Sequence, residues 1–232
     1  MKRNINFIAP TTNPSAPMQS SFFEDIDIPG MDYSPGQLIL IGGESWDVNQ
    51  YVLKNCILEG IPDIPVLYFC GNYLTPVTNT LVRLEAESFR DAEGHIDMDE
   101  FHLPPVYFDA TKDPSVSYLI GRIFHYLETQ DIGCIVLDSL QDIQGGPVKG
   151  CREHQLNGTL QLLKTIAEVT FTVVIVLSRI NYPRRNRPLS VDDLQEAPYV
   201  EKYCDQIILI DSERPFVEEL IDIPADVRNL AL

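Results

Sequence analysis

The stretch CIVLDSLQDIQG, residues 134–145, decides the fold of this chain. Its apolar run from Cys134 to Leu137 has the length and composition of a buried strand, and the carboxylate of Asp138 follows directly. A buried parallel strand delivers its last residue to the carboxyl edge of the sheet, where α/β proteins bind their ligands. The Walker-B element of nucleotide-binding proteins is built in this way, with its carboxylate beside a magnesium–nucleotide complex. The stretch therefore predicts an α/β fold with Asp138 at the ligand-binding edge.

Short apolar runs alternate with amphipathic stretches on both sides of this strand. Strands are predicted over residues 38–43, 66–70, 105–110, 134–138, 172–178 and 206–211, and helices over 48–60, 74–90, 116–130 and about 152–168. Such alternation predicts a mostly parallel central sheet that is flanked by helices on both faces. Residues 1–20, which are rich in Pro, Asn, Ser and Thr, are predicted to form a flexible arm, and residues 21–232 one domain.

The composition restricts the class of protein. The formal charge is −17 at pH 7, whereas proteins that hold nucleic acid by non-specific electrostatics normally carry the opposite balance. Contact with DNA or RNA therefore requires a local basic patch or a basic partner; otherwise the acidic surface simply maintains solubility. The five cysteines lack CxxC spacing and the four histidines are scattered, so no metal site is predicted. The sequence contains no signal peptide or membrane-spanning run, which predicts a soluble cytoplasmic protein.

A glycine pair follows the first predicted strand, where a strand–helix turn would bind phosphate. Eight residues starting at Gly43 have the register of a phosphate-binding loop, which closes with Gly, Lys and Ser or Thr. The lysine of such a loop meets the β- and γ-phosphates and the hydroxyl holds magnesium. Here the closing residues are Val48, Asn49 and Gln50, so each chemical requirement fails. No catalytic residue is assigned, and the position of a degenerate nucleotide pocket is outlined by Gly43, Ser45, Asn49, Gln50 and Asp138.

The second half of the chain carries short motifs in a fixed order. They are DSLQ (138–141), LSR (177–179), RP (187–188), DLQE (193–196), VE (200–201) and Asp205. Together with Asn55 in the first strand–helix unit, this series resembles the RecA-type motor domain of DnaB-like replicative helicases over about residues 22–212. The resemblance implies a RecA-like P-loop NTPase fold, in which the family binds ATP with magnesium and moves along single-stranded DNA.

The departures from this family concentrate at its catalytic positions. Arg179 stands where the family has the glutamine that senses the γ-phosphate, and Asn72 stands at the position of the general-base glutamate. An amide cannot accept the proton of an attacking water at neutral pH. The family's arginine finger, which is commonly worth about 10³–10⁵ in rate, has no matching Lys-x-Arg motif here. The sequence therefore favours a pseudo-ATPase.

Positive charge gathers at two places in this acidic chain. Four arginines fall within residues 179–187, and Tyr182 among them has a ring on which a base could stack. Two more cations follow the Walker-B strand, in the loop that the resemblance places against single-stranded DNA. The predicted nucleic-acid contacts are Lys149, Arg152, Arg179, Tyr182, Arg184, Arg185 and Arg187. The alternative is a solvated loop whose arginines pair with neighbouring acidic residues, namely Asp192, Asp193 and Glu196.

Three hypotheses about function remain open. The favoured one is a non-catalytic DnaB-like protein that acts in DNA replication or recombination by binding single-stranded DNA or a helicase-family or replication protein. The second is an ATP-dependent DNA helicase or ATPase with an atypical phosphate loop, and the third is a pure protein-interaction scaffold. Under the favoured hypothesis no cofactor is expected, and ATP with magnesium enters only where the degenerate loop still binds. A monomer or small oligomer is expected.

Overall fold

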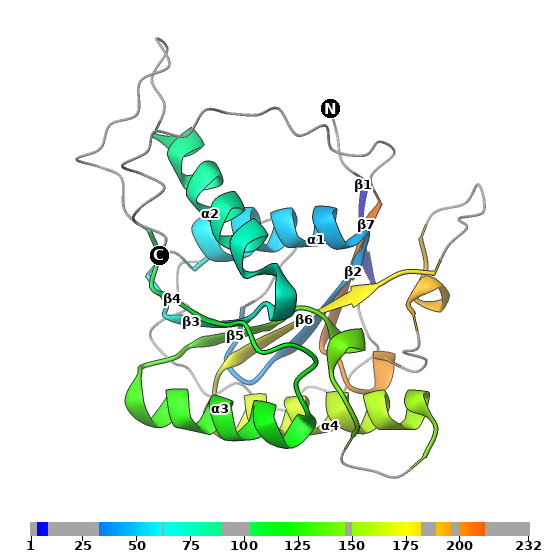
Figure 1. The fold of residues 1–232 in the computed structure, drawn as a ribbon. Helices are drawn as coiled ribbons and strands as arrows, with labels where there is room; N and C mark the ends of the chain where they lie inside the picture. The colour runs from blue at the N-terminus through cyan, green and yellow to red at the C-terminus, as the bar shows by residue number, and fades with distance from the viewer. Residues whose placement is uncertain are drawn as a thin grey trace.

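The computed structural model contains a seven-stranded sheet with helices on both faces (Figure 1). It describes residues 4–8, 33–61, 63–89, 103–146, 150–181, 189–195 and 200–211. The strands are β1 (Asn4–Ile8), β2 (Leu38–Gly43), β3 (Val66–Phe69), β4 (Val106–Asp109), β5 (Cys134–Leu137), β6 (Val173–Arg179) and β7 (Gln206–Asp211). Their order across the sheet is β1-β7-β2-β6-β5-β3-β4. All neighbours pair in parallel except β1, which runs antiparallel to β7, so the predicted fold class is confirmed.

The helices cover the sheet in two layers. They are α1 (Ser45–Tyr51), which continues as a π-helical segment η1 (Val52–Leu58), then α2 (Leu74–Ser88), α3 (Val116–Thr129) and α4 (Arg152–Thr170). In Figure 1, α1 and α2 lie on one face and α3 and α4 on the other. Among the described residues, no helix combines the length and the apolarity needed to cross a bilayer.

The strands are apolar on both sides because both faces of the sheet are covered. Along β2, Ile39 and Ile41 belong to the core beneath α1 and α2, whereas Leu38 and Leu40 belong to the core above α3 and α4. All four side chains are fully buried. This alternation within a continuous apolar run is what a two-sided parallel sheet requires.

Two elements differ from the prediction. Residues 4–8, assigned from composition to a flexible arm, form β1 and pair with β7, whose outer edge would otherwise leave its backbone groups without a strand partner. The rest of the predicted arm lies outside the described residues. The first helix begins at Ser45 instead of residue 48, because the single extended residue Glu44 separates the glycine pair from helical backbone.

The amino edge of the sheet is fixed by one ion pair. Lys164 of α4 donates to both carboxylate oxygens of Asp205, at 2.9 and 2.7 Å, and to the carbonyl of Gly36 at 2.9 Å. The same carboxylate accepts the backbone N–H of Leu38 at 2.7 Å. Asp205 thereby joins the start of β2 to α4 and β7. The candidate site lies at the opposite edge of the sheet, where the parallel strands end.

Candidate functional site

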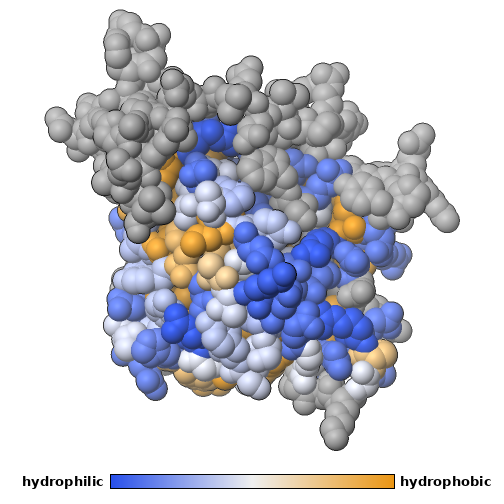
Figure 2. Space-filling model, in the orientation of Figure 1, coloured by the Kyte–Doolittle hydropathy of each residue, from blue (hydrophilic) through white to orange (hydrophobic). Residues whose placement is uncertain are grey.

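The carboxyl ends of four neighbouring strands meet at one edge of the sheet. Gly43 of β2 pairs with Arg179 of β6, and Phe69 of β3 pairs with Leu137 of β5. Parallel pairing therefore brings the turns that follow β2, β3, β5 and β6 close together, although they come from distant parts of the sequence. Strongly hydrophilic residues gather on the surface around the end of β6 and the turn after β5 (Figure 2).

Asp138 lies at this edge, as its position after β5 predicts. Its backbone N–H donates to the carbonyl of Phe69 at 2.9 Å, which fixes the carboxylate between β3 and β5. The Oδ2 atom is buried and has no hydrogen-bond partner among the described residues. Burial raises the pKa of Asp138 to about 6; a hydrogen bond from Asn49 and the charge of Arg179 lower it, and the charge of Asp142 raises it. The site therefore holds a carboxylate with incomplete pairing.

The segment at the phosphate-loop position is a helix. Only Glu44 separates β2 from α1, and the backbone N–H of Val48 donates to the carbonyl of Glu44 at 3.0 Å. A Cβ atom on Gly43 would lie 2.8 Å from the Ile210 carbonyl oxygen and 2.9 Å from Val48 Cγ2. The second glycine of the pair is thus required by close packing, and the backbone does not curl into an open phosphate loop.

Asn49, which the sequence register assigns to the position of the loop lysine, faces Asp138. It is 8% exposed, its Oδ1 atom accepts the Tyr68 hydroxyl at 3.0 Å, and its side chain also bonds to Asp138. The neighbouring Gln50 is buried, and its Nε2 atom has no partner within the described part of the chain. Tyr68 was not identified from the sequence, although a tyrosine inside an otherwise apolar strand is a signal, because a buried hydroxyl needs a hydrogen-bond partner.

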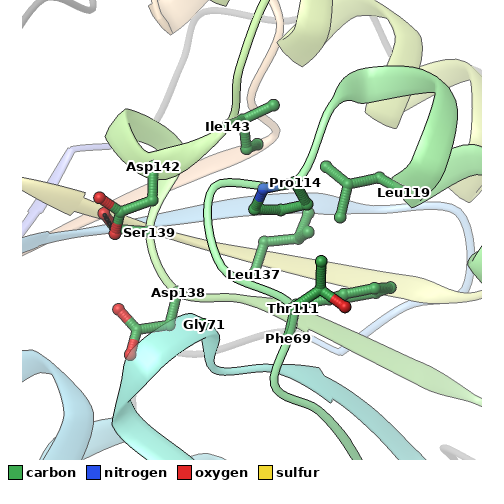
Figure 3. A pocket seen from close by; sticks show the side chains of 10 residues that line it. All are labelled: Phe69, Gly71, Thr111, Pro114, Leu119, Leu137, Asp138, Ser139, Asp142 and Ile143. Carbon is green, nitrogen blue, oxygen red and sulfur yellow. Dashed lines mark hydrogen bonds between the residues drawn. The ribbon is translucent and has the colours of Figure 1, made fainter.

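A small pocket opens beside Asp138, toward the turns that follow β3 and β4 (Figure 3). The carboxylates of Asp138 and Asp142 lie on one side of it, and apolar side chains, including Leu119 and Leu137, lie on the other. The lining residues are Phe69, Gly71, Thr111, Pro114, Leu119, Leu137, Asp138, Ser139, Asp142 and Ile143. The pocket therefore offers acidic and apolar groups.

Asp109, at the end of β4, accepts several hydrogen bonds through its carboxylate. Its carboxylate accepts Arg122 Nε at 2.9 Å, the Tyr118 hydroxyl at 3.0 Å and the Thr111 backbone N–H at 3.0 Å. Burial raises the pKa of Asp109, but the hydrogen bonds from Thr111, Arg122 and Tyr118 outweigh it and leave that pKa below its ordinary value. Asp109 is therefore a structural carboxylate, in contrast to Asp138.

The turn after β5 is bonded to the end of β6. This turn is a 3-10 helix, η3 (Leu140–Asp142). Asp142 forms an ion pair with Arg179 and accepts the Ser139 hydroxyl at 3.0 Å. Gln141 accepts the backbone N–H of Arg179 at 3.1 Å and donates to the Ser178 hydroxyl at 3.0 Å.

The segment that leaves β6 is paired with a later one. Ile180 and Leu194 form an antiparallel bridge, and the backbone N–H of Asn181 donates to the Asp193 carbonyl at 2.7 Å. The Asp193 carboxylate also accepts the backbone N–H of Ser190 at 2.9 Å. Short strand-like stretches on both sides of the arginine-rich sequence are thus held side by side.

A family model for the DnaB-like helicase C-terminal domain matches residues 80–222, more than half of the chain. The chain belongs to this family. The DnaB-like domain is also similar to a solved DnaB-like replicative helicase described with its interactions with primase, at a TM-score of 0.58 and 17% identity, covering 78% of this chain and 48% of the helicase. A second solved structure, described as an ATPase domain, matches with a TM-score of 0.60 and 17% identity, covering 78% of this chain and 71% of that domain.

These similarities confirm the predicted family and show that the DnaB-like domain has a RecA-like ATPase fold. At this level of identity the solved structures establish the fold alone. The chain spans about half the length of the first helicase. No curated protein sequence matches the chain.

The DnaB-like domain brings some of the predicted site residues together and leaves others outside the described residues. Asn49 and Asp138 are in contact, and Ser45 begins α1. Arg179 ends β6, and Arg152 begins α4 and donates to the Gln141 carbonyl at 2.8 Å. The residues that fall outside the described ranges are Lys149, Tyr182, Arg184, Arg185 and Arg187.

Asn72, which the sequence assigns to the general-base position, lies in a 3-10 turn, η2 (Gly71–Tyr73), and is exposed. Gly71 before it has a φ of +52°, a left-handed conformation that favours glycine. No Asp or Glu occupies this turn. Among the described residues that line the adjacent pocket, the carboxylates are Asp138 and Asp142, both on the β5 side.

Proposed function

We propose that this DnaB-like domain does not turn over ATP and that it acts in DNA replication or recombination by binding single-stranded DNA. The observation that carries the proposal is the packing around α1: the helix begins at Ser45, Val48 packs on Gly43, and Asn49 bonds to Tyr68 and Asp138. We infer that these contacts leave no room for a triphosphate between α1 and Asp138.

The chemistry of these residues does not fit a magnesium–nucleotide complex. Asn49 supplies no positive charge to a triphosphate, and Gln50 supplies no hydroxyl to a metal ion. The nearby carboxylates of Glu44, Asp47 and Asp138 repel a polyanion. No catalytic step is therefore assigned to a bound nucleotide, and Asn72 offers no general base for one.

Binding of single-stranded DNA is supported by the placement of the arginine-rich sequence. Its two ends leave the carboxyl edge of the sheet through the paired stretches around Ile180 and Leu194. Arg184, Arg185 and Arg187 follow within that sequence, and Tyr182 can stack on a base. Screening over about 10 Å limits repulsion from the remote acidic surface, so a local basic segment can hold phosphates on a chain with a net charge of −17.

The nucleotide part of the proposal is tested by isothermal titration of the purified protein with ATP and magnesium. We expect no heat of binding and no change in the melting temperature at millimolar ATP. Binding accompanied by hydrolysis would overturn the proposal and favour an ATPase with an atypical loop. Binding without hydrolysis would indicate that a nucleotide serves as a structural ligand, and it would contradict the inference that the packing around α1 excludes a triphosphate.

The DNA part is tested by fluorescence anisotropy with a labelled oligothymidylate. We expect salt-sensitive binding that weakens when Arg184 and Arg185 are both changed to Gln, with a salt-dependence slope lower by about 0.7 for each lost phosphate contact. The matched control changes Lys54 and Lys202 to Gln, which removes the same charge elsewhere. Equal losses in both double variants would indicate that only net charge matters, and absence of binding would favour a protein partner. The DnaB-like helicase among the similar structures interacts with primase, so a replication protein would be tested next.

A further inference from the structure

The sequence places Arg179 among the nucleic-acid contacts, but its Nη2 atom and both of its backbone polar groups bond within the protein. Its guanidinium donates to both carboxylate oxygens of Asp142. Its backbone N–H donates to Gln141 Oε1 at 3.1 Å, and its carbonyl accepts the backbone N–H of Gln195 at 2.8 Å. One residue thus connects the end of β6 to the turn after β5 and to the segment that returns after the arginine-rich sequence.

Gln141 reinforces the same junction from the β5 side. Its Nε2 atom donates to the Ser178 hydroxyl at 3.0 Å and to the Gln195 carbonyl at 2.7 Å. We call the four residues Gln141, Asp142, Arg179 and Gln195 the loop base. Their hydrogen bonds join η3 to Arg179 at the end of β6 and to Gln195.

We propose that Arg179 is a positioning residue which, paired with Asp142, fixes the loop base and does not itself contact nucleic acid. The inference rests on the proposed function, because the affinity for single-stranded DNA is one of its two readouts. The side chains of Arg179 and Asp142 are 33% and 27% exposed, so the ion pair is half-buried. Moving Arg179 to a phosphate would leave Asp142 without its cation beside Asp138, a neighbouring negative charge whose pKa Asp142 already raises.

The opposing possibility is that Asp142 competes with DNA phosphates for Arg179. The two possibilities predict different signs for a pair of neutralising substitutions. Under competition, Asp142→Asn would free a cation and tighten DNA binding, whereas Arg179→Gln would weaken it. Under positioning, both substitutions loosen the loop base and weaken binding, although they change the net charge in opposite directions.

The experiment measures anisotropy of a fluorescein-labelled oligothymidylate with Arg179→Gln, Asp142→Asn, the double variant and a Lys54→Gln control. Lys54 is an exposed cation whose carboxylate partner, Glu59, is 3.9 Å away. We expect each loop-base variant to bind about fivefold more weakly, with a salt-dependence slope equal to that of the unmodified protein. The double variant binds no more weakly than the weaker single variant, because both remove the same ion pair. The control changes affinity less than twofold.

Tighter binding by Asp142→Asn, or a slope that falls by about 0.7 in Arg179→Gln, would overturn the proposal. Amide hydrogen exchange of the DNA-free proteins tests the positioning role independently of DNA binding. Positioning predicts faster exchange at residues 178–181 and 193–195 in both single variants, and unchanged exchange there would also overturn it. If the unmodified protein does not bind the oligonucleotide but both single variants show faster exchange, the proposed function is contradicted and the positioning role of the Arg179–Asp142 pair is supported. If Arg179→Gln does not fold, Arg179→Lys replaces it. Because lysine can still pair with Asp142, we expect amide exchange at residues 178–181 and 193–195 to be slower in Arg179→Lys than in Asp142→Asn.

Discussion

Asp138 and Asp142 lie at the same edge of the sheet with only three residues between them, but we expect their carboxylates to affect the stability of the native state in opposite directions. Asp138 carries a buried oxygen without a hydrogen-bond partner among the described residues, and its pKa is raised to about 6 by burial. Asp142 is half-buried and has Arg179 as its cation. A buried charge without full pairing destabilises the native state, whereas a well-placed ion pair supports it.

We therefore predict that Asp138→Asn increases stability at neutral pH by about 1–3 kcal/mol. The pKa of Asp138 in the folded state, about 6, lies above the ordinary value of 3.8, so the native state binds more protons between these pH values. The free energy of unfolding should then fall as the pH rises from about 4 to about 6, and Asp138→Asn should abolish this part of the decline. Urea denaturation over a pH series measures both effects. Asp142→Asn is the matched control and should lower stability by about 1 kcal/mol at pH 7.

Gly43 and Gly121 allow a similar comparison of two glycines. A Cβ atom on Gly43 would meet the Ile210 carbonyl oxygen at 2.8 Å, and a backbone carbonyl cannot move aside cheaply. Gly121 lies inside α3, where an added Cβ atom meets nothing within 4 Å. We expect Gly43→Ala to lower the free energy of unfolding by about 1–3 kcal/mol and Gly121→Ala to raise it by about 0.5–1 kcal/mol. Thermal denaturation of both variants checks the signs, and a neutral Gly43→Ala would contradict the packing role.

At the scale of elements, three separate segments depend on one lysine at the amino edge. Lys164 of α4 bonds to Asp205 and to the Gly36 carbonyl, and Asp205 holds the start of β2 through the Leu38 N–H. Loss of the lysine leaves a partly buried carboxylate without its cation while its backbone contacts remain.

We predict that Lys164→Met lowers the free energy of unfolding by about 1–3 kcal/mol, with an unchanged denaturant slope. Lys54→Met, which removes an exposed pair at 3.9 Å, should change it by less than about 0.5 kcal/mol. Urea denaturation at pH 7 compares the two. Equal effects would show that the connection between α4, β2 and β7 contributes no more than a surface contact.

The sequence predicted the elements better than it predicted their contacts. The apolar runs gave all six parallel strands, because each is buried on both faces and carries few polar residues. The motif spacing assigned Asn49 and Asp138 to one degenerate pocket, since strand–turn–helix units orient these positions toward one edge, but it did not predict the bond between them. The bond from Tyr68 to Asn49 and the pair of Asp142 with Arg179 were not predictable, because they depend on the order of strands across the sheet. Composition also concealed β1, whose pairing is decided by the edge of β7.

At the scale of the whole molecule, the accessibility of the cysteine thiols probes the two hydrophobic cores on either side of the sheet. Cys56, Cys70, Cys134 and Cys204 are buried, and Cys151 is exposed. Burial raises the pKa of Cys56 and of Cys70 to about 12, which suppresses the reactive thiolate.

We predict that a thiol-reactive dye labels Cys151 rapidly in the native protein and labels the other four only on unfolding. Mass spectrometry of the labelled peptides over time would show this separation. Cys151→Ser should remove the fast phase without changing the slow one. Fast labelling of Cys134, in the middle of the sheet, would contradict the described core.

The order of strands has a consequence for synthesis on the ribosome. β2, a fully apolar strand, pairs with β6 and β7, which are translated about 135 and 170 residues later. At usual elongation rates of about 5–20 residues per second, the emerging β2 therefore waits about 7–27 s for its first sheet neighbour. During that interval its unpaired edges are a template for other nascent chains, so we expect the yield of folded protein to depend on the rate of translation and on how well chaperones shield β2.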